Sequence, residues 1–214
     1  SKIGILTHKN LINKMKKSIF LAALVLISAG CFAQKANVSK ARSLADAETP
    51  DYAGARAAIA EALQNDETKD QPNTWYVAGF IGYKEFYNGN MKQQLGQQFD
   101  KKAWGDAVYE SLNYWTKAYD MAKIPTIDKK GREKFDTRTP KSIVPKVVEY
   151  FNSIPLIIAG FDAYQAGDPS KAYDMFIAHC NIPESDMMKE NPSEMAKIVC
   201  DSNYYIYLYQ SGQL

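Results

Sequence analysis

Few side chains in this sequence have the types and spacing that chemistry requires. Histidine, the usual proton carrier near neutral pH, occurs only at His8 and His179. The sequence holds no HExxH, GxSxG, P-loop, GxGxxG or CxxC pattern. Because His179 falls at a helix position that normally packs, we expect it at a helix interface. The sequence therefore predicts no catalytic residue, no metal site and no cofactor.

Pairs of carboxylates form the next candidate sites, because paired acids serve in acid–base catalysis and in calcium binding. Glu184 with Asp186 and Asp128 with Asp136 are such pairs, and both lie in segments that resemble loops. Neither pair is surrounded by the glycine-centred loop of alternating oxygen ligands that calcium requires. We therefore expect these carboxylates to be solvated.

The first 33 residues have the features of a leader. Lys14, Lys16 and Lys17 surround Met15, and residues 19–27 carry no polar side chain, a combination typical of a secretory signal peptide. The apolar run is shorter than the roughly 20 residues that span a bilayer. Residues 15–33 are therefore predicted to be a signal peptide, and residues 1–14 to be upstream or cloning-derived sequence.

Residues 28–34 read SAGCFAQ and allow two cleavage sites. Ordinary signal peptidase would cut after Ala33, because Cys31 and Ala33 form a small-x-small pattern. Cleavage before Cys31 would instead give a lipoprotein, although Ser28 stands where a lipobox usually has Leu. Membrane attachment is expected only through a lipid on Cys31.

Two further cysteines, Cys180 and Cys200, remain after the leader. In an oxidising compartment they can pair as a disulfide, whereas in the cytosol they would be buried thiols. Both alternatives remain open.

The net charge changes when the leader is removed. The chain has 26 basic and 24 acidic residues; the leader holds five of the lysines and no acid, so 21 basic and 24 acidic residues remain, a net charge of −3. No basic patch of the kind that nucleic acids require remains, so we expect no nucleic-acid partner. A hydrophobic share of 46% and a charged share of 23% fit one globular domain, residues 34–214.

Three segments share one spacing: a small residue, a large apolar residue four positions on, and a small or medium residue three further on. They are Ala55-Ile59-Ala62, Ser111-Trp115-Ala118 and Ala172-Phe176-His179. This spacing puts the three side chains on one helical face. Because the small residue lets a neighbouring helix approach closely, the predicted unit is a helical hairpin.

The partner helices recur as Trp75-x-x-Ala78-Gly79-x-x-Gly82 and Leu156-x-x-Ala159-Gly160-x-x-Ala163. From Leu156 to Pro183 the combined pattern resembles the tetratricopeptide repeat (TPR), W-x2-L-G-x2-Y, A-x3-F and P. The resemblance implies an all-α fold in which TPR-like hairpins stack in a right-handed superhelix of about 3.5 irregular repeats.

The spacing departs from the repeat at two insertions, one around residues 88–105 and one at residues 125–140. The second is rich in charge and flanked by proline, which predicts a solvated loop. Such irregular spacing, with an MKK leader and an Ala-Gln junction, resembles envelope TPR proteins of Bacteroidetes-type bacteria. That resemblance implies a periplasmic or outer-membrane-associated protein of a Gram-negative bacterium.

In this family the first helix of each hairpin lines a concave groove. The resemblance places there Asn73, Tyr76, Phe80, Tyr83, Ile154, Ile157, Phe161 and Tyr164. Family members that clamp a terminal carboxylate use Lys and Asn at such positions, and beyond Asn73 this chain has neither. An aromatic groove suits a protein or peptide segment or a sugar ring. Alternatively, the insertion at 88–105 folds back and fills the groove with Met91, Leu95, Phe99 and Trp104.

The C-terminal segment resembles the first helix of a fourth repeat, because residues 208–213 echo residues 163–168. Tyr204, Tyr205, Tyr207 and Tyr209 would then pack against a following helix. We expect either that Leu214 is a truncation point or that this helix docks onto another chain.

Helices are predicted at 36–47, 51–65, 73–88, a helical insertion continuing into 103–122, 141–166, 169–180 and 193–210. Asp51, Asn73, Asp168 and Ser193 are the predicted N-caps. Pro145 and Pro155 predict that the segment 141–166 divides into two helices near Ser153.

The sequence thus predicts a non-catalytic exported scaffold for protein–protein interaction in the bacterial cell envelope. The alternative is a glycan- or nutrient-binding accessory protein or lipoprotein of the outer membrane.

Overall fold

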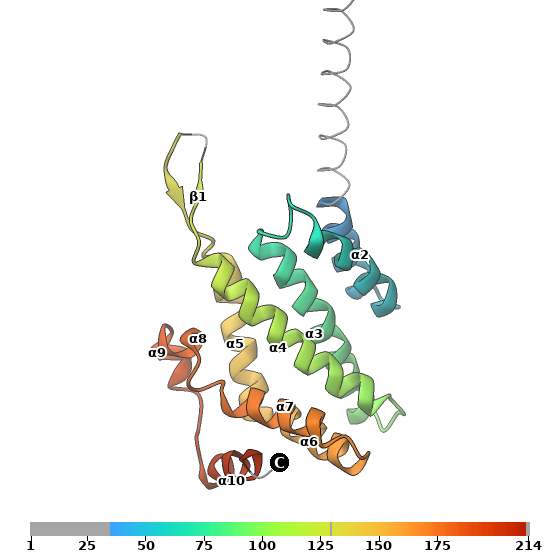
Figure 1. Ribbon diagram of the computed structural model, residues 1–214. Helices are drawn as coiled ribbons and strands as arrows, with labels where there is room; N and C mark the ends of the chain where they lie inside the picture. The colour runs from blue at the N-terminus through green and yellow to red at the C-terminus, as the bar shows by residue number, and fades with distance from the viewer. Residues whose placement is uncertain (1–34, 129, 213–214) are drawn as a thin grey trace, which may run out of the picture.

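The computed structural model describes residues 35–128 and 130–212, which form an all-α fold (Figure 1). Residues 35–45 are helical. They are followed by α2 (Tyr52–Gln64), α3 (Pro72–Gln94), α4 (Lys101–Ala122), α5 (Arg138–Ser153), α6 (Pro155–Gln165), α7 (Pro169–Cys180), α8 (Asp186–Lys189), α9 (Pro192–Met195) and α10 (Ser202–Ser211). The predicted upstream segment, signal peptide and Cys31 lie outside the described residues.

Two of the predicted helix starts are confirmed by their caps. The Asp51 carboxylate accepts a hydrogen bond from the Gly54 backbone N–H at 2.8 Å, and α2 begins at the next residue. Asp168 does the same for Lys171 at 3.0 Å, with proline at the first position of α7. The predicted cap at Asn73 is wrong: the N-cap is Gln71, two residues earlier, and Pro72 is the first residue of α3.

The insertion at 88–105 lengthens a helical hairpin. Helix α3 continues to Gln94, and α4 begins at Lys101 after the Asp100 carboxylate accepts from the Ala103 N–H at 2.9 Å. The two helices run side by side along most of their length (Figure 1). They approach closely because Gly79 lies against the Trp115 indole, where a Cβ would find no room.

A second close hairpin joins α6 and α7. A Cβ at Gly160 would lie 2.5 Å from Cε1 of Phe176, so the small and large residues of the repeated pattern meet here as predicted. Ile154 separates α5 from α6 in the left-handed conformation, with φ of 49°. The predicted division of 141–166 near Ser153 is therefore confirmed.

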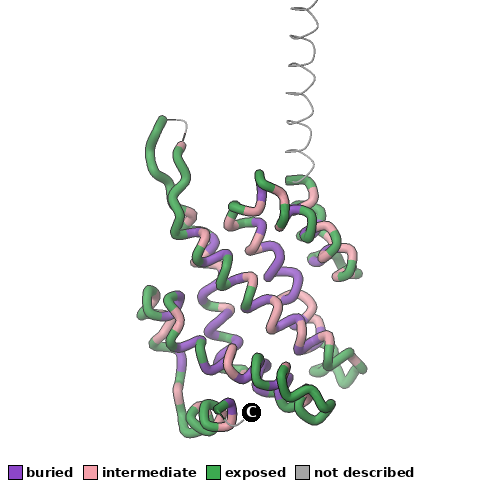
Figure 2. Tube along the Cα trace, viewed as in Figure 1, coloured by how far each residue is buried: buried purple, intermediate pink, exposed green. Residues whose placement is uncertain are grey.

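The core runs between the facing sides of the helices, while the hairpin tips and α10 are largely exposed (Figure 2). One apolar cluster joins α4 and α5 around Trp115 and Tyr150; a second joins residues 35–45, α2 and α3. Within the described residues, no single helix is both long and apolar enough to cross a membrane; only α5 and α6 together, bent by 53°, meet those criteria.

Most of the second insertion is exposed, as predicted, but its last three residues open α5, with Thr139 buried, and the rest is not only a loop. Thr126–Ile127 (β1) and Glu133–Lys134 (β2) pair as a short antiparallel hairpin, and all four residues are exposed. Gly131 lies in its turn with φ of 74°, which favours glycine.

The prediction of one helix over 193–210 is wrong. Asn191 caps the four-residue α9, so Ser193 lies inside that helix, and the chain is not helical again until Ser202. There the Asp201 carboxylate accepts from the Asn203 and Tyr204 N–H groups and starts α10. The Asp201 cap therefore starts a new helix within residues 193–210, which the apolar periodicity predicts to be one helix.

Candidate functional site

A cleft of about 290 Å³ lies between α4, α6 and α7, and we call it the α4–α6 cleft. Its floor is apolar and its rim is charged. The floor is formed by Gly105, Ala159, Ala163 and Met175, and the rim by the exposed Ala166 with Lys101, Lys102, Asp106, Asp162, Asp168 and Lys171.

Small residues on facing helices build the cleft. A Cβ at Gly105 would lie 2.6 Å from the Ala159 Cβ, so α4 and α6 cross with almost no side chain between them. Beyond this crossing, Ala163 of α6 and Ala166, the C-cap of that helix, also line the cleft. These short side chains leave the space that the cleft occupies.

The rim holds several charges that already have partners. Lys102 Nζ lies 2.8 Å from an Asp106 carboxylate oxygen, and Lys171 also pairs with Asp106. Burial by itself would raise the pKa of Asp106, but the hydrogen bonds from the two lysines outweigh it and hold that pKa below its ordinary value. Asp168 is engaged as the cap of α7.

Two rim side chains are uncommitted. Lys101 and Asp162 make no hydrogen bond or ion pair with any other described side chain. They border both this cleft and a neighbouring cavity of about 230 Å³. One cation and one anion at the junction of two cavities can therefore pair with a bound molecule.

The neighbouring cavity, which we call the aromatic lobe, is lined by Phe86, Phe99 and Trp104 with the amides of Asn90 and Gln93. The Trp104 Nε1 donates to the Asn90 Oδ1 at 2.9 Å, which fixes both side chains. Phe99 meets the Trp104 ring edge-on at a centroid distance of 6.4 Å. Apolar ring surface next to amide groups suits ligands with both apolar and hydroxyl surface.

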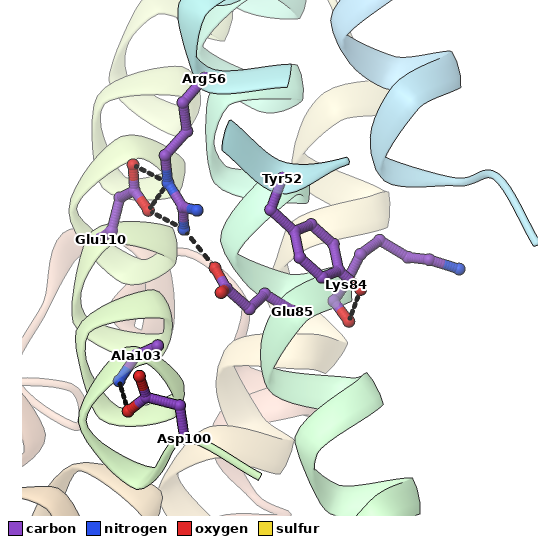
Figure 3. Close-up of polar contacts among 7 residues, drawn as sticks. All are labelled: Tyr52, Arg56, Lys84, Glu85, Asp100, Ala103 and Glu110. Atoms are coloured by element: carbon purple, nitrogen blue, oxygen red, sulfur yellow. Dashed lines mark hydrogen bonds and ion pairs between the residues drawn. The ribbon is translucent and has the colours of Figure 1, made fainter. Parts of the chain in front are cut away.

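A third, polar cavity of about 160 Å³ lies on the other side of Phe99 and Trp104. Beside it, the Arg56 guanidinium of α2 reaches Glu85 of α3 at 2.6 Å and Glu110 of α4 at 2.6 Å (Figure 3). Burial would lower the pKa of Arg56, but hydrogen bonds to the two carboxylates raise it. This network links α2, α3 and α4 beside the cavities.

The insertion at 88–105 thus contributes walls to all three cavities. It does so as the extended ends of α3 and α4, with Phe99 and Trp104 half-buried or buried in the wall. The insertion thus forms one wall of the α4–α6 cleft, and it does not fold back over the first part of α3.

Tyr76, Phe80 and Tyr83, predicted to line a groove, form an aromatic row along α3. Arg42 lies over the Phe80 ring at 5.1 Å and Lys146 over the Tyr83 ring at 5.4 Å. These residues line none of the three cavities. Asn73 is exposed near the start of the same helix.

The predicted residues of α6 lie on a different face from the cleft. Ile157 is buried at 2% exposure against α7, and Phe161 packs on Phe176 at 5.0 Å. Ile154 is half-buried at the start of α6, and Tyr164 is exposed. The structure therefore brings the predicted residues of α3 and α6 to separate surfaces.

Sequence reasoning missed Lys101, Asp162 and the alanines of the cleft. The alanine spacing on α6 is visible in the repeated pattern, but that pattern predicts only packing against another helix. The crossing with Gly105 depends on how α4 and α6 are placed, which no local pattern encodes.

Cys180 and Cys200 are free thiols, so the alternative of a disulfide is not formed here. Burial raises the pKa of the Cys180 thiol to about 11, and also raises that of Cys200. Because the thiolate is the reactive form, both cysteines are suited to packing and poorly suited to catalysis.

Comparison with known proteins gives no family: no protein-family model, no curated protein and no solved structure matches this chain significantly.

Proposed function

We propose that this chain is a non-catalytic scaffold that holds a segment of a partner protein in the α4–α6 cleft. The observation that carries the proposal is the cleft itself: an apolar floor that accepts a partner side chain, beside Lys101 and Asp162, which have no partner among the described side chains. Apolar burial provides most of the affinity in such interfaces, and rim charges provide orientation.

We further propose that the helices are TPR-like hairpins. The helices form three pairs in which the two members pack on each other: residues 35–45 with α2, α3 with α4, and α6 with α7. In the last two, a glycine of the first helix lies against an aromatic ring of the second. Helix α5 lies between the second and third pairs as an addition to the regular pattern.

Binding is favoured over catalysis by the state of the titratable groups. His179 is buried with a pKa lowered to about 4 by burial. Asp106 is held ionised by two lysines. Neither group has the pKa near neutrality that a general acid or base needs.

We propose that the protein acts in the envelope of a Gram-negative bacterium, on the basis of its predicted signal peptide. The exported chain should then begin at Gln34, which mass spectrometry of the protein purified from its host would show. A diacyl or triacyl mass on Cys31 would show instead that the exported protein is a lipoprotein.

The scaffold proposal is tested by filling the cleft. Replacing Ala163 by arginine puts a long side chain into the apolar floor, whereas Tyr173→Arg changes an exposed residue of α7 outside the cleft. We expect the wild type and Tyr173→Arg to capture the same stoichiometric partner from an envelope extract, and Ala163→Arg to lose it. Equal capture by all three proteins, or no partner, would contradict the proposal.

The aromatic lobe favours a second candidate, a glycan-binding accessory protein, because Phe99 and Trp104 lie beside two amides and Asp162. Calorimetry with an oligosaccharide panel would test it. Saturable binding that Phe99→Ala abolishes and Tyr76→Ala preserves would support the glycan function, since Tyr76 lies outside the lobe. No binding by the wild type would exclude this candidate for the glycans used.

A further inference from the structure

A separate cavity of about 390 Å³ lies between the end of α5, α7 and α10. Phe151, His179, Tyr204 and Tyr207 line it, together with Asp201, whose Oδ1 also accepts the N-cap hydrogen bonds of α10. It shares no lining residue with the α4–α6 cleft. Its volume lies in the range of small-ligand sites.

The rings are held in different orientations. His179 stacks on Phe151 at 4.5 Å, with 7° between the planes, and Tyr207 stands at 85° to His179 at 6.2 Å. Tyr204 is tilted by 52° from Phe151 at 5.7 Å. His179 and Phe151 therefore cover one face of each other, and Tyr204 and Tyr207 stand at other angles beside them.

The electrostatics of the lining favour positive charge. Among the described residues that line the cavity, Asp201 is the only acid and there is no Lys or Arg. His179 adds no positive charge near neutral pH, because burial lowers its pKa to about 4. Aromatic rings carry a negative quadrupole on their faces, so a cation among them is attracted by the rings as well as by the carboxylate.

We propose that this cavity binds an organic cation of the quaternary-ammonium class. An anion would meet the Asp201 carboxylate with no opposing cation. A metal ion needs several His, Cys, Asp or Glu ligands, and no group of three lies together in the described part of the chain. A methylated ammonium needs none of these ligands and is recognised by aromatic rings.

The test is calorimetric titration of the folded, full chain with choline and with its neutral isostere 3,3-dimethylbutan-1-ol. We expect saturable choline binding and an affinity for the isostere that is about tenfold weaker, because only the cation–π and carboxylate interactions differ. Choline that does not bind, or an isostere that binds as tightly, overturns the proposal.

Two variants and a control place the binding in this cavity. Asp201→Asn removes the charge but keeps a good N-cap for α10, so choline should bind several-fold more weakly while helicity by circular dichroism is unchanged. Tyr207→Leu should abolish binding. Tyr209→Leu, on the exposed side of the same helix, should leave it intact. Unchanged affinity in Asp201→Asn, or equal loss in both tyrosine variants, would overturn the assignment.

Discussion

The imidazole of His179 is 1% exposed and lies between the rings of Phe151 and Tyr207. Its Nδ1 has no hydrogen-bond partner among the described residues. Burial penalises the charged form, and this is why the pKa falls to about 4. The neutral ring is therefore part of the packing between α5, α7 and α10, as the sequence predicted for a helix-interface histidine.

This burial predicts how stability depends on pH. In the unfolded chain the histidine titrates near pH 6.5, and in the folded chain near 4, so the unfolded state binds more protons between these values. The contribution of His179 is fully present above about pH 6.5 and is lost as the pH falls to about 4, by on the order of 3 kcal/mol.

We expect His179→Leu to flatten the dependence of stability on pH in this range. The measurement is the free energy of urea unfolding of the wild type and the variant at several pH values between those two limits. If both proteins lose stability equally on acidification, the effect belongs to other groups.

At the scale of single residues, the sequence allowed the caps at Asp51 and Asp168 to be predicted, because capping depends on residues within one turn. It could not show that Lys101 and Asp162 would share two cavities. That relation depends on where α4 and α6 lie in the folded chain.

Helices α2, α3 and α4 are joined by the Arg56 network, whose side chains are only partly exposed. Replacing Arg56 by methionine would leave the Glu85 and Glu110 carboxylates close together without their cation. We expect a loss of about 1–2 kcal/mol in the free energy of unfolding, measured by urea titration.

The control removes the carboxylates as well. The triple variant Arg56→Met, Glu85→Gln, Glu110→Gln should regain most of the loss, because no unpaired charge remains. A triple variant as unstable as the single one would show that arginine packing, rather than charge, joins the helices.

The contact between α6 and α7 gives a second prediction about elements. In Gly160→Ala the new methyl group would lie 2.5 Å from Cε1 of Phe176, and we expect a loss of about 1–3 kcal/mol. Phe176→Leu shortens the opposing side chain. The double variant should therefore lose less free energy of unfolding than the sum of the two single losses, by at least about 0.5 kcal/mol. Additive losses in urea unfolding would contradict the close approach.

Element boundaries were predictable where one periodic face continues without interruption, as in α2 and α7. The C-terminal segment was not, because the cap at Asp201 overrides a pattern that looks continuous. The boundary predicted for α3 at residue 88 lies six residues too early, because the insertion, which is predicted to be helical and to continue into the next helix, instead extends α3 itself to Gln94.

For the whole molecule, the sequence predicted the all-α class and the hairpins, because small and large residues alternate at helical spacing. It placed the binding surface on Tyr76 and Phe161, which lie on separate faces. The α4–α6 cleft and the aromatic lobe instead lie where the inserted end of the α3–α4 hairpin meets α6. A local pattern identifies a hairpin, but the gap between two hairpins depends on how they pack together.

Our proposal places a segment of a partner protein in the α4–α6 cleft. Its most direct test is a photo-crosslinking amino acid in place of Ala163 on the cleft floor, compared with the same amino acid in place of Tyr173 outside it. After illumination in an envelope extract, we predict one adduct of defined mass from position 163 and none from position 173. No adduct from position 163, or the same adduct from both positions, would contradict the claim.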